Sequence, residues 1–288
     1  MPVINTVFFL SDYGLADEFV GVVHAVIARH SPGARVIDLG HGVTPFDVGA
    51  GAAMLERAVD HLGPGVVLAV VDPGVGGARR AVALESARSD GPRFFVGPDN
   101  GLLVDAIERW GGAALAVELA RPEVPGTFDG RDVLAPAAAA LCNGSPLVSL
   151  GPEIDAAGLV RLAKPDLFEH GNPGRTALVA EVRWVDRFGN VQLAGRPEDL
   201  AGALGARTVR VAGKDAAGEA IPLRRVGAFG ELAENECGLL VDANGHLAIV
   251  VNEGSAAGLL GVTRGSLVEL AWPTDQPFPR HPAGYDPR

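Results

Sequence analysis

The chain has 288 residues, of which 48% are hydrophobic, and its formal net charge is −11. This length and composition suit one large domain or two smaller ones with sizeable cores, and the negative charge argues against a nucleic-acid partner bound through phosphate neutralisation. Cys142 and Cys237 form neither a disulfide framework nor a metal-binding pattern. No apolar segment suits a signal peptide or the roughly 18 residues of a membrane span. We therefore expect a cytoplasmic protein with reduced thiols.

The first half of the chain alternates predicted strands and helices. Apolar runs predict strands over residues 7–10, 34–39, 65–71, 81–84 and 94–96. Helical spacing of apolar residues predicts helices over residues 17–29, 45–62, 101–110 and 132–142. Strands that alternate with helices in this way are typical of a parallel sheet with right-handed crossovers.

The second half of the chain has a different composition and a different pattern of predicted elements. Residues 162–176 are rich in proline, glycine and polar residues, which predicts an interdomain linker. Beyond it, strands are expected over residues 177–185, 191–193, 208–211, 247–251 and 266–270. We therefore predict an α/β N-terminal domain with a mostly parallel sheet over residues 1–163, then a smaller, mostly antiparallel β domain over residues 175–272. The proline-rich tail, 273–288, is expected to be extended and weakly ordered.

A carboxylate, a flexible loop and a guanidinium follow the third predicted strand. Asp72 comes directly after the apolar run, and Pro73 and three glycines separate it from Arg79 and Arg80. Because α/β folds present their chemistry beyond the carboxyl ends of strands, Asp72 is a candidate catalytic residue. A Pro-Gly turn stabilised by an aspartate is an equally good explanation of this segment alone.

Other predicted strand ends, and the segment before one predicted helix, also carry polar residues beside glycine. These segments are Ser11–Gly14, His41–Asp47, Gly97–Gly101 and Thr127–Asp132. Taken singly, Asp12 and Asp99 are equally well explained as turn residues, and His41 is better explained as a structural histidine than as a base. Their convergence on one edge of a parallel sheet would nevertheless form a cleft.

Several common site patterns do not occur in the sequence. No Gly-x-Gly-x-x-Gly or Walker pattern follows a predicted strand, which argues against ordinary dinucleotide or ATP binding. No Gly-x-Ser-x-Gly elbow indicates a serine hydrolase, and no His, Cys and carboxylate cluster has zinc spacing. We therefore expect no metal and no cofactor.

Two segments of the second half allow both a functional and a structural interpretation. Residues 186–190 join two predicted strands, so they suit a hairpin turn, but Asp186 is also suited to an ammonium group and Phe188 to a flat ring. Residues 252–257 lead from a strand into a helix, where the backbone amides either face a ligand or form an ordinary helix N-terminus.

Taken together and in order, these segments resemble a known enzyme family. The motifs that carry the resemblance are Ser11–Gly14, Thr44–Val48, Asp72–Gly76, Pro98–Gly101, Phe128–Asp132 and Asp186–Asn190. The chain resembles the S-adenosyl-L-methionine (SAM) hydroxide adenosyltransferases, the adenosine-forming SAM hydrolases, which are related to the bacterial fluorinase and chlorinase. The resemblance covers residues 4–271. It implies a homotrimer in which SAM lies between the N-terminal domain of one subunit and the C-terminal domain of a neighbour.

The resemblance also implies roles for particular residues. Asp12 would hold the ribose hydroxyls, Phe46 would lie near the ribose and the sulfonium, and Asp186 would hold the methionine ammonium group. The remaining substrate-binding positions that it implies are Asn100, Phe188, Asn190, Ser255 and Ala256. Asp72 and Arg79 match an acid and an arginine that hold the attacking water.

This chain departs from the family pattern at two positions. Asp129 stands where the family has a histidine that helps to hold the water, and Ala243 stands where a serine usually lies near the methionine carboxylate. We therefore expect Asp72, Arg79 and Asp129 to be the catalytic residues. A binding protein for SAM or adenosine that has lost turnover is the alternative hypothesis.

Overall fold

The computed structural model describes residues 4–88, 90–121, 126–172, 175–195, 206–211 and 220–273. The chain divides into two compact units, which we call the N-terminal unit, Met1–Ala163, and the C-terminal unit, Lys164–Arg288. Residues 274–288, which make up nearly all of the predicted proline-rich tail, lie outside the described residues.

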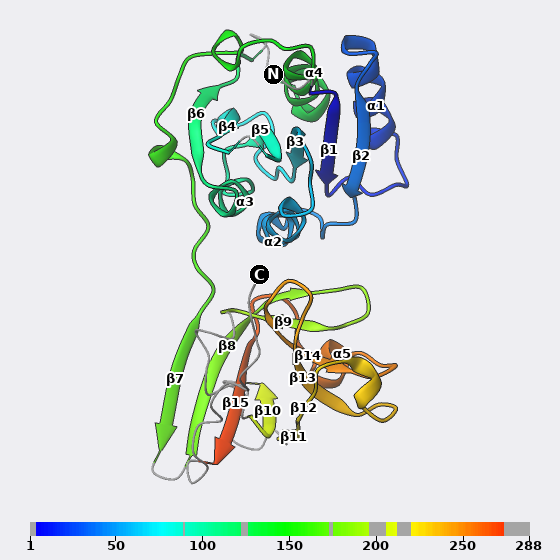
Figure 1. The fold of residues 1–288 in the computed structure, drawn as a ribbon, viewed down its shortest axis with the longest axis vertical. Coiled ribbons are helices and arrows are strands. Elements are labelled where there is room, and N and C mark those ends of the chain that lie inside the picture. The colour runs from blue at the N-terminus through cyan, green and yellow to red at the C-terminus, as the bar shows by residue number, and fades with distance from the viewer. Residues whose placement is uncertain are drawn as a thin grey trace. The chain divides into compact units, whose positions relative to one another are not determined.

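The strands of the N-terminal unit form one six-stranded sheet (Figure 1). They are β1 Thr6–Ser11, β2 Arg35–Gly40, β3 Gly65–Val70, β4 Ala81–Ser86, β5 Pro92–Pro98 and β6 Ala113–Glu118. Their order is β2-β1-β3-β5-β4-β6, and β4 alone runs antiparallel to its neighbours. The predicted mostly parallel sheet is confirmed, whereas β6 was not predicted from the sequence.

Helices cover both faces of this sheet (Figure 1). The described residues of the unit form four α-helices, α1 Phe19–His30, α2 Val48–Val59, α3 Val104–Arg109 and α4 Ala135–Cys142. Helix α1 packs against α4 on one face, and α2 packs against α3 on the other. Fully buried side chains such as Phe9, Leu68 and Leu134 fill the core on the face that α1 and α4 cover. Because burial of apolar surface is the main favourable term in folding, this core holds the strand ends in place.

The parallel strands bring their carboxyl ends to one edge of the sheet. In the register, Leu10 pairs with Gly40 and Ser11 pairs with Val70. The residues that follow β1, β2 and β3 therefore leave the sheet side by side, as the strand-end motifs predicted.

The C-terminal unit is mostly antiparallel, as predicted. Its strands are β7 Leu167–Asn172, β8 Arg175–Val185, β9 Val191–Leu193, β10 Thr208–Val211, β11 Ile221–Pro222, β12 Arg224–Arg225, β13 Cys237–Val241, β14 Leu247–Val251 and β15 Leu267–Pro273. The sheet order is β11-β10-β15-β8-β9-β14-β13-β12, with β7 beside β8. A short helix, α5 Ala256–Leu260, follows β14.

Much of the linker predicted over residues 162–176 is a strand. Residues 167–172 form β7, which pairs antiparallel with β8 along its whole length. The sequence pattern missed β7 because it pairs with one neighbour and leaves apolar side chains such as Phe168 half exposed, so it lacks the apolar run of a buried strand.

Both cysteines are free and buried. Burial raises the pKa of each thiol, at Cys142 and at Cys237, to about 11. Because the thiolate is the reactive form, burial disfavours thiol chemistry at both positions.

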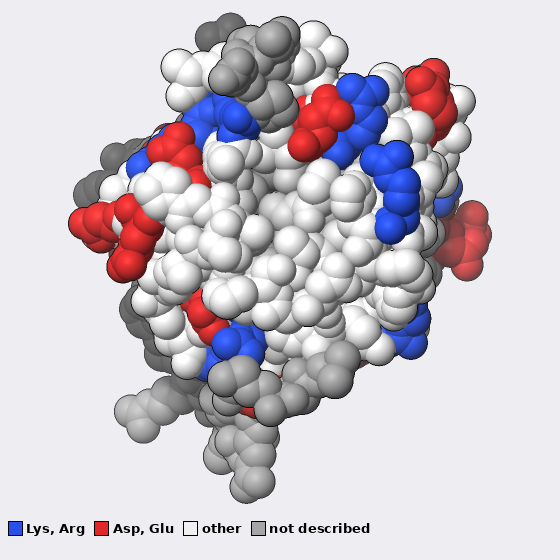
Figure 2. Space-filling model, turned by 90° about the horizontal axis from the view of Figure 1, so that it is seen from above, with Lys and Arg blue, Asp and Glu red and all other residues white. Residues whose placement is uncertain are grey.

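The described residues contain no helix long and apolar enough to cross a membrane. On the face seen in Figure 2, basic and acidic side chains lie interspersed around an uncharged centre and form no continuous basic stripe among the described residues. Proteins that bind nucleic acid through its phosphates concentrate positive charge, so this face lacks that electrostatic pattern.

Candidate active site

A cavity of about 260 Å³ lies at the carboxyl edge of the N-terminal sheet. It is lined by residues from five segments: Asp12 and Tyr13 after β1, Phe19 at the start of α1, Pro45 and Phe46 before α2, Asp72 and Val75 after β3, and Thr127, Phe128, Asp129 and Gly130 at the start of the π-helix Gly130–Leu134. The predicted convergence of strand-end loops thus forms a real pocket, and it combines three carboxylates with several aromatic rings.

Arg79 joins two carboxylates at this pocket. Its Nε donates to Asp72 Oδ1 at 2.7 Å, and its Nη2 donates to both Asp72 Oδ2 and Asp129 Oδ2, the latter at 2.7 Å. The side chains are 11% exposed for Arg79 and 6% for each aspartate. Charge-assisted hydrogen bonds of this kind hold the three groups in one fixed geometry.

A second guanidinium, from Arg121, reaches the same cluster. Arg121 Nη2 lies 3.2 Å from Asp129 Oδ2 and also donates to the backbone oxygen of Arg79 at 2.7 Å. Two arginines therefore offset two buried carboxylates. Arg121 was not among the predicted site residues because it follows β6, the strand that was not predicted. Its place beyond the carboxyl end of that strand is the signal that could have identified it.

The loop after β3 takes its shape from glycine. Gly76 has φ +75°, and a Cβ at this position would lie 2.9 Å from the backbone oxygen of Gly126. A side chain at residue 76 would therefore clash as well as strain the backbone. The close approach of Gly76 to Gly126 brings the loop that carries Asp72 beside the loop that carries Asp129.

A group of aromatic rings forms one wall of the pocket. Tyr13, Phe19 and Phe128 pack with ring centroids 5.3–5.6 Å apart, which is the usual range for edge-to-face pairs. A Cβ on Gly130 would lie 2.2 Å from the Tyr13 hydroxyl, so the first residue of the π-helix must be small. Burial raises the pKa of Tyr13, and the nearby carboxylates raise it further, so the phenol stays neutral.

Hydrogen bonds join the segment that follows β1 to the segment that follows β2. Asp12 Oδ2 accepts a hydrogen bond from the backbone of Phe46 at 2.9 Å, and Gly14 donates to the backbone oxygen of His41 at 2.7 Å. Phe46 is 73% exposed and has φ +68°, a left-handed backbone that is rare for a bulky residue. Strain of this kind is typical of functional sites, where surrounding contacts maintain it.

Asn100 is not among the residues that line the pocket. Its amide nitrogen donates to the backbone oxygen of Val71 at 2.9 Å, and its amide oxygen accepts from the backbone of Leu102 at 3.2 Å. The side chain therefore fixes the end of β5 to the segment that carries Asp72. In this structure Asn100 positions the neighbouring segment.

The remaining predicted residues lie together in the C-terminal unit. Asp186 accepts hydrogen bonds from the backbone of Phe188 and from the backbone and side chain of Asn190, at 2.8–2.9 Å. Ser255 caps α5 by accepting from Gly258 at 2.9 Å. The hairpin-turn and helix-cap interpretations of these two segments are thus both confirmed, and Phe188 remains 72% exposed.

The two segments of the C-terminal unit are in direct contact. Gly189 has φ +83°, and a Cβ there would lie 2.0 Å from Ser255 Oγ, while the backbone oxygen of Gly189 accepts from Ala257 at 2.9 Å. This glycine lets the turn that carries Phe188 pack on the start of α5. The structure therefore brings Phe188 and Asn190 beside Ser255 and Ala256, as one group.

Comparisons with known proteins give a consistent result. A family model described as the SAM hydroxide adenosyltransferase N-terminal domain matches residues 7–151, and one for the C-terminal domain matches residues 180–269. A protein of Salinispora tropica named (R)-S-adenosyl-L-methionine hydrolase is 48% identical over 267 residues, which are 91% of this chain and 96% of the relative. A fluorinase of an Actinoplanes species is 30% identical over 182 residues, 54% of this chain and 61% of the fluorinase.

A solved structure of an uncharacterized conserved protein from Thermotoga maritima matches this chain with a TM-score of 0.79 at 33% identity. The match covers 92% of this chain and 99% of the other.

The left-handed backbone at Phe46 generates a testable prediction. In Phe46→Gly the strain of about 1–2 kcal/mol is relieved, whereas in Phe46→Ala it is retained. Relative to alanine, glycine loses about 0.4–1 kcal/mol through the unfolded state, which offsets only part of the relieved strain. We therefore expect Phe46→Gly to be the more stable by roughly 0.5–1 kcal/mol. Denaturant unfolding of the two variants measures this difference. An alanine variant that is clearly the more stable of the two would contradict the left-handed backbone at residue 46.

Proposed function

The chain belongs to the SAM hydroxide adenosyltransferase family, and from that membership we propose that it hydrolyses SAM to adenosine and L-methionine. A water oxygen bonds to ribose C5′ while the C5′–S bond breaks. The sulfur keeps the electron pair, methionine leaves as a neutral thioether, and one proton is released. The (R) sulfonium epimer is the proposed substrate, because the Salinispora tropica relative is named for it.

The observation that carries this proposal is Arg79 held between Asp72 and Asp129 at the pocket. A sulfonium is already a good leaving group, so the reaction mainly needs a water molecule positioned in line with the C5′–S bond. Positioning of this kind supplies roughly 7–11 kcal/mol of a barrier. Asp72 and Asp129 accept hydrogen bonds from that water, and Arg79 keeps both carboxylates in place.

Asp129 takes the place of the histidine that the family pattern has at this position. Its carboxylate reaches the same arginine that Asp72 binds, at 2.7 Å, so it joins the cluster that holds the water. A second acceptor is therefore present although the histidine is absent. This arrangement favours hydrolysis over the alternative of a binding protein without turnover.

The other residues are proposed to bind the substrate. Asp12 and Phe46, joined by their hydrogen bond, receive the ribose and the sulfonium. In the C-terminal unit Asp186 receives the methionine ammonium, and Phe188, Asn190, Ser255 and Ala256 receive the adenine. Each oxygen of Asp186 already accepts at least one hydrogen bond within its turn, which fixes the carboxylate, and an ionised carboxylate has acceptor sites left for an added cation.

Each unit carries one part of the proposed set, and this supports a shared site. We propose a cytoplasmic homotrimer in which the N-terminal unit of one subunit and the C-terminal unit of a neighbour enclose SAM. The protein uses SAM as substrate and needs no cofactor, and we propose neither a nucleic acid nor a membrane as partner.

Product analysis tests the function directly. Purified protein incubated with each sulfonium epimer of SAM is expected to yield adenosine and methionine in equal amounts, with the (R) epimer consumed faster. Chromatography of the reaction mixture measures both products. Tight binding of SAM without adenosine would establish the non-catalytic alternative instead.

Substitutions should separate the group that holds water from the residues that bind substrate. Asp72→Asn and Asp129→Asn are expected to lower kcat by about 100-fold or more with little change in KM, since they act on the nucleophile. Asp12→Ala and Asp186→Ala should mainly raise KM, by about 10-fold or more, because each removes a charged hydrogen-bond acceptor. Steady-state kinetics with a thermal unfolding check distinguishes the two patterns.

Arg161→Ala is the control for this series. Arg161 pairs with Glu108 at the exposed surface, and neither residue lines the pocket. We expect its kcat to stay near that of the unsubstituted protein. An Asp129→Asn variant with full activity would reduce Asp129 to a residue that holds its loop.

Halide should not replace water as the nucleophile. A halide bound between Asp72 and Asp129 would face negative charge in a buried site, which is unfavourable. At molar chloride or fluoride we expect no 5′-chloro- or 5′-fluoro-adenosine by mass spectrometry, while adenosine still forms. Detection of either halonucleoside would contradict the role given to the two carboxylates.

A further inference from the structure

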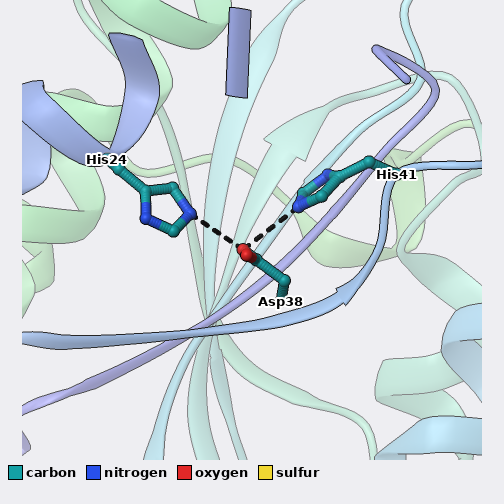
Figure 3. A group of neighbouring side chains, drawn as sticks. All are labelled: His24, Asp38 and His41. Atoms are coloured by element: carbon teal, nitrogen blue, oxygen red, sulfur yellow. Dashed lines mark hydrogen bonds and ion pairs between the residues drawn. The ribbon is translucent and has the colours of Figure 1, made fainter. Parts of the chain in front are cut away.

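Two histidines and one aspartate meet outside the pocket. His24 lies on α1, Asp38 on β2 and His41 just after β2, and both imidazole rings point at the same carboxylate (Figure 3). His24 Nε2 lies 2.8 Å and His41 Nε2 lies 3.1 Å from Asp38 Oδ1. One nitrogen of each ring and one carboxylate oxygen all lie within 4.8 Å of one another.

His41 is held firmly in this arrangement. Its side chain is 3% exposed, its ring packs against Phe9 with centroids 4.6 Å apart, and its Nδ1 lies 2.7 Å from Ser11 Oγ. In the tautomer with the proton on Nδ1, the Ser11 oxygen accepts a hydrogen bond from Nδ1–H, which leaves the lone pair of Nε2 facing Asp38. Metal-binding histidines commonly have such a partner on the second ring nitrogen, because it fixes both tautomer and ring orientation.

The other ring nitrogen of His41, Nε2, is the second feature that suits a ligand. His41 Nε2 is buried and makes no hydrogen bond of good geometry, although Asp38 lies 3.1 Å away. The carboxylate therefore lies beside a buried imidazole nitrogen that is suited to a further partner.

We propose that His24, Asp38 and His41 bind a divalent transition-metal ion, for which Zn²⁺ is the best fit. Two imidazole nitrogens and one carboxylate oxygen are ligands that Zn²⁺ commonly takes, and three protein ligands leave a fourth position for water. Ligands about 2.0–2.1 Å from Zn²⁺ in a tetrahedron lie about 3.3–3.4 Å apart, which is slightly more than the two distances from a histidine nitrogen to the Asp38 oxygen here. His24 and Asp38 are 35% and 41% exposed, so they have room to move apart while His41 stays fixed.

A metal at this place would hold the strand ends that carry the pocket. It would join α1 to the end of β2, and His41 in turn contacts Ser11 by its side chain and Gly14 by its backbone oxygen, on either side of Asp12. The ion would act by fixing this loop, and no step of the proposed reaction passes through it. The proposal is independent of the identity of the substrate.

Metal titration of the whole chain tests the proposal. Protein freed of metal by a chelator and then dialysed is titrated with Zn²⁺ alone by calorimetry, and with Co²⁺ alone by visible absorption. We expect one ion per chain, a rise in thermal midpoint that grows with Zn²⁺ concentration, and the intense visible bands of tetrahedral Co²⁺.

Variants assign the ligands. His24→Gln and Asp38→Asn, at partly exposed positions that should fold, are each expected to weaken Zn²⁺ binding by more than about 100-fold, since even outer-shell partners of metal ligands contribute 10–100-fold. His30→Gln, an exposed histidine on the same helix, is the matched control and should bind as the unsubstituted chain does. No saturable binding, or binding that survives in both His24→Gln and Asp38→Asn, would overturn the proposal and leave Asp38 as an ion-pair partner of the two histidines.

Discussion

The bridge from Arg79 to Asp72 and Asp129 is the interaction on which the pocket depends. Two carboxylates this well buried would repel each other and each would lose its hydration, so neither is stable there without a cation. Removing one partner of a buried ion pair typically costs about 3–5 kcal/mol, because the remaining charge is left uncompensated. The same bridge joins the loop after β3 to the loop before the π-helix, so it fixes the shape of the pocket as well as its charge.

Small residues allow this bridge to form. The contact of Gly76 with Gly126 lets the two loops approach, and Gly130 leaves space for the Tyr13 hydroxyl. Three aromatic rings then form an apolar wall beside the charged cluster. An apolar wall reduces access of bulk water, which strengthens electrostatic interactions inside the pocket and suits a reaction that needs one positioned water.

Structural and functional roles overlap in both units. Asp12, Asp186 and Ser255 each accept a hydrogen bond from a nearby backbone N–H group, so each stabilises part of the local fold. These bonds do not compete with a role toward substrate, because they hold a side chain in one orientation before the substrate arrives. A group that is oriented in advance loses less entropy on binding. The turn interpretation and the binding interpretation of these residues are therefore compatible.

Local patterns in the sequence determined most of the elements and the first part of the site. Apolar periodicity located β1 to β5 and the helices, and Asp72 and Arg79 stand only seven positions apart in the loop between β3 and β4. Edge strands such as β7 escaped this reasoning, since a strand with one neighbour needs no continuous apolar run. Contacts between distant segments were decided by tertiary structure alone. Arg121, which follows the unpredicted strand β6, contacts Asp129, and His24 on α1 contacts Asp38 on β2. Which side chains meet depends on sheet order and register, and these follow from how the whole core packs.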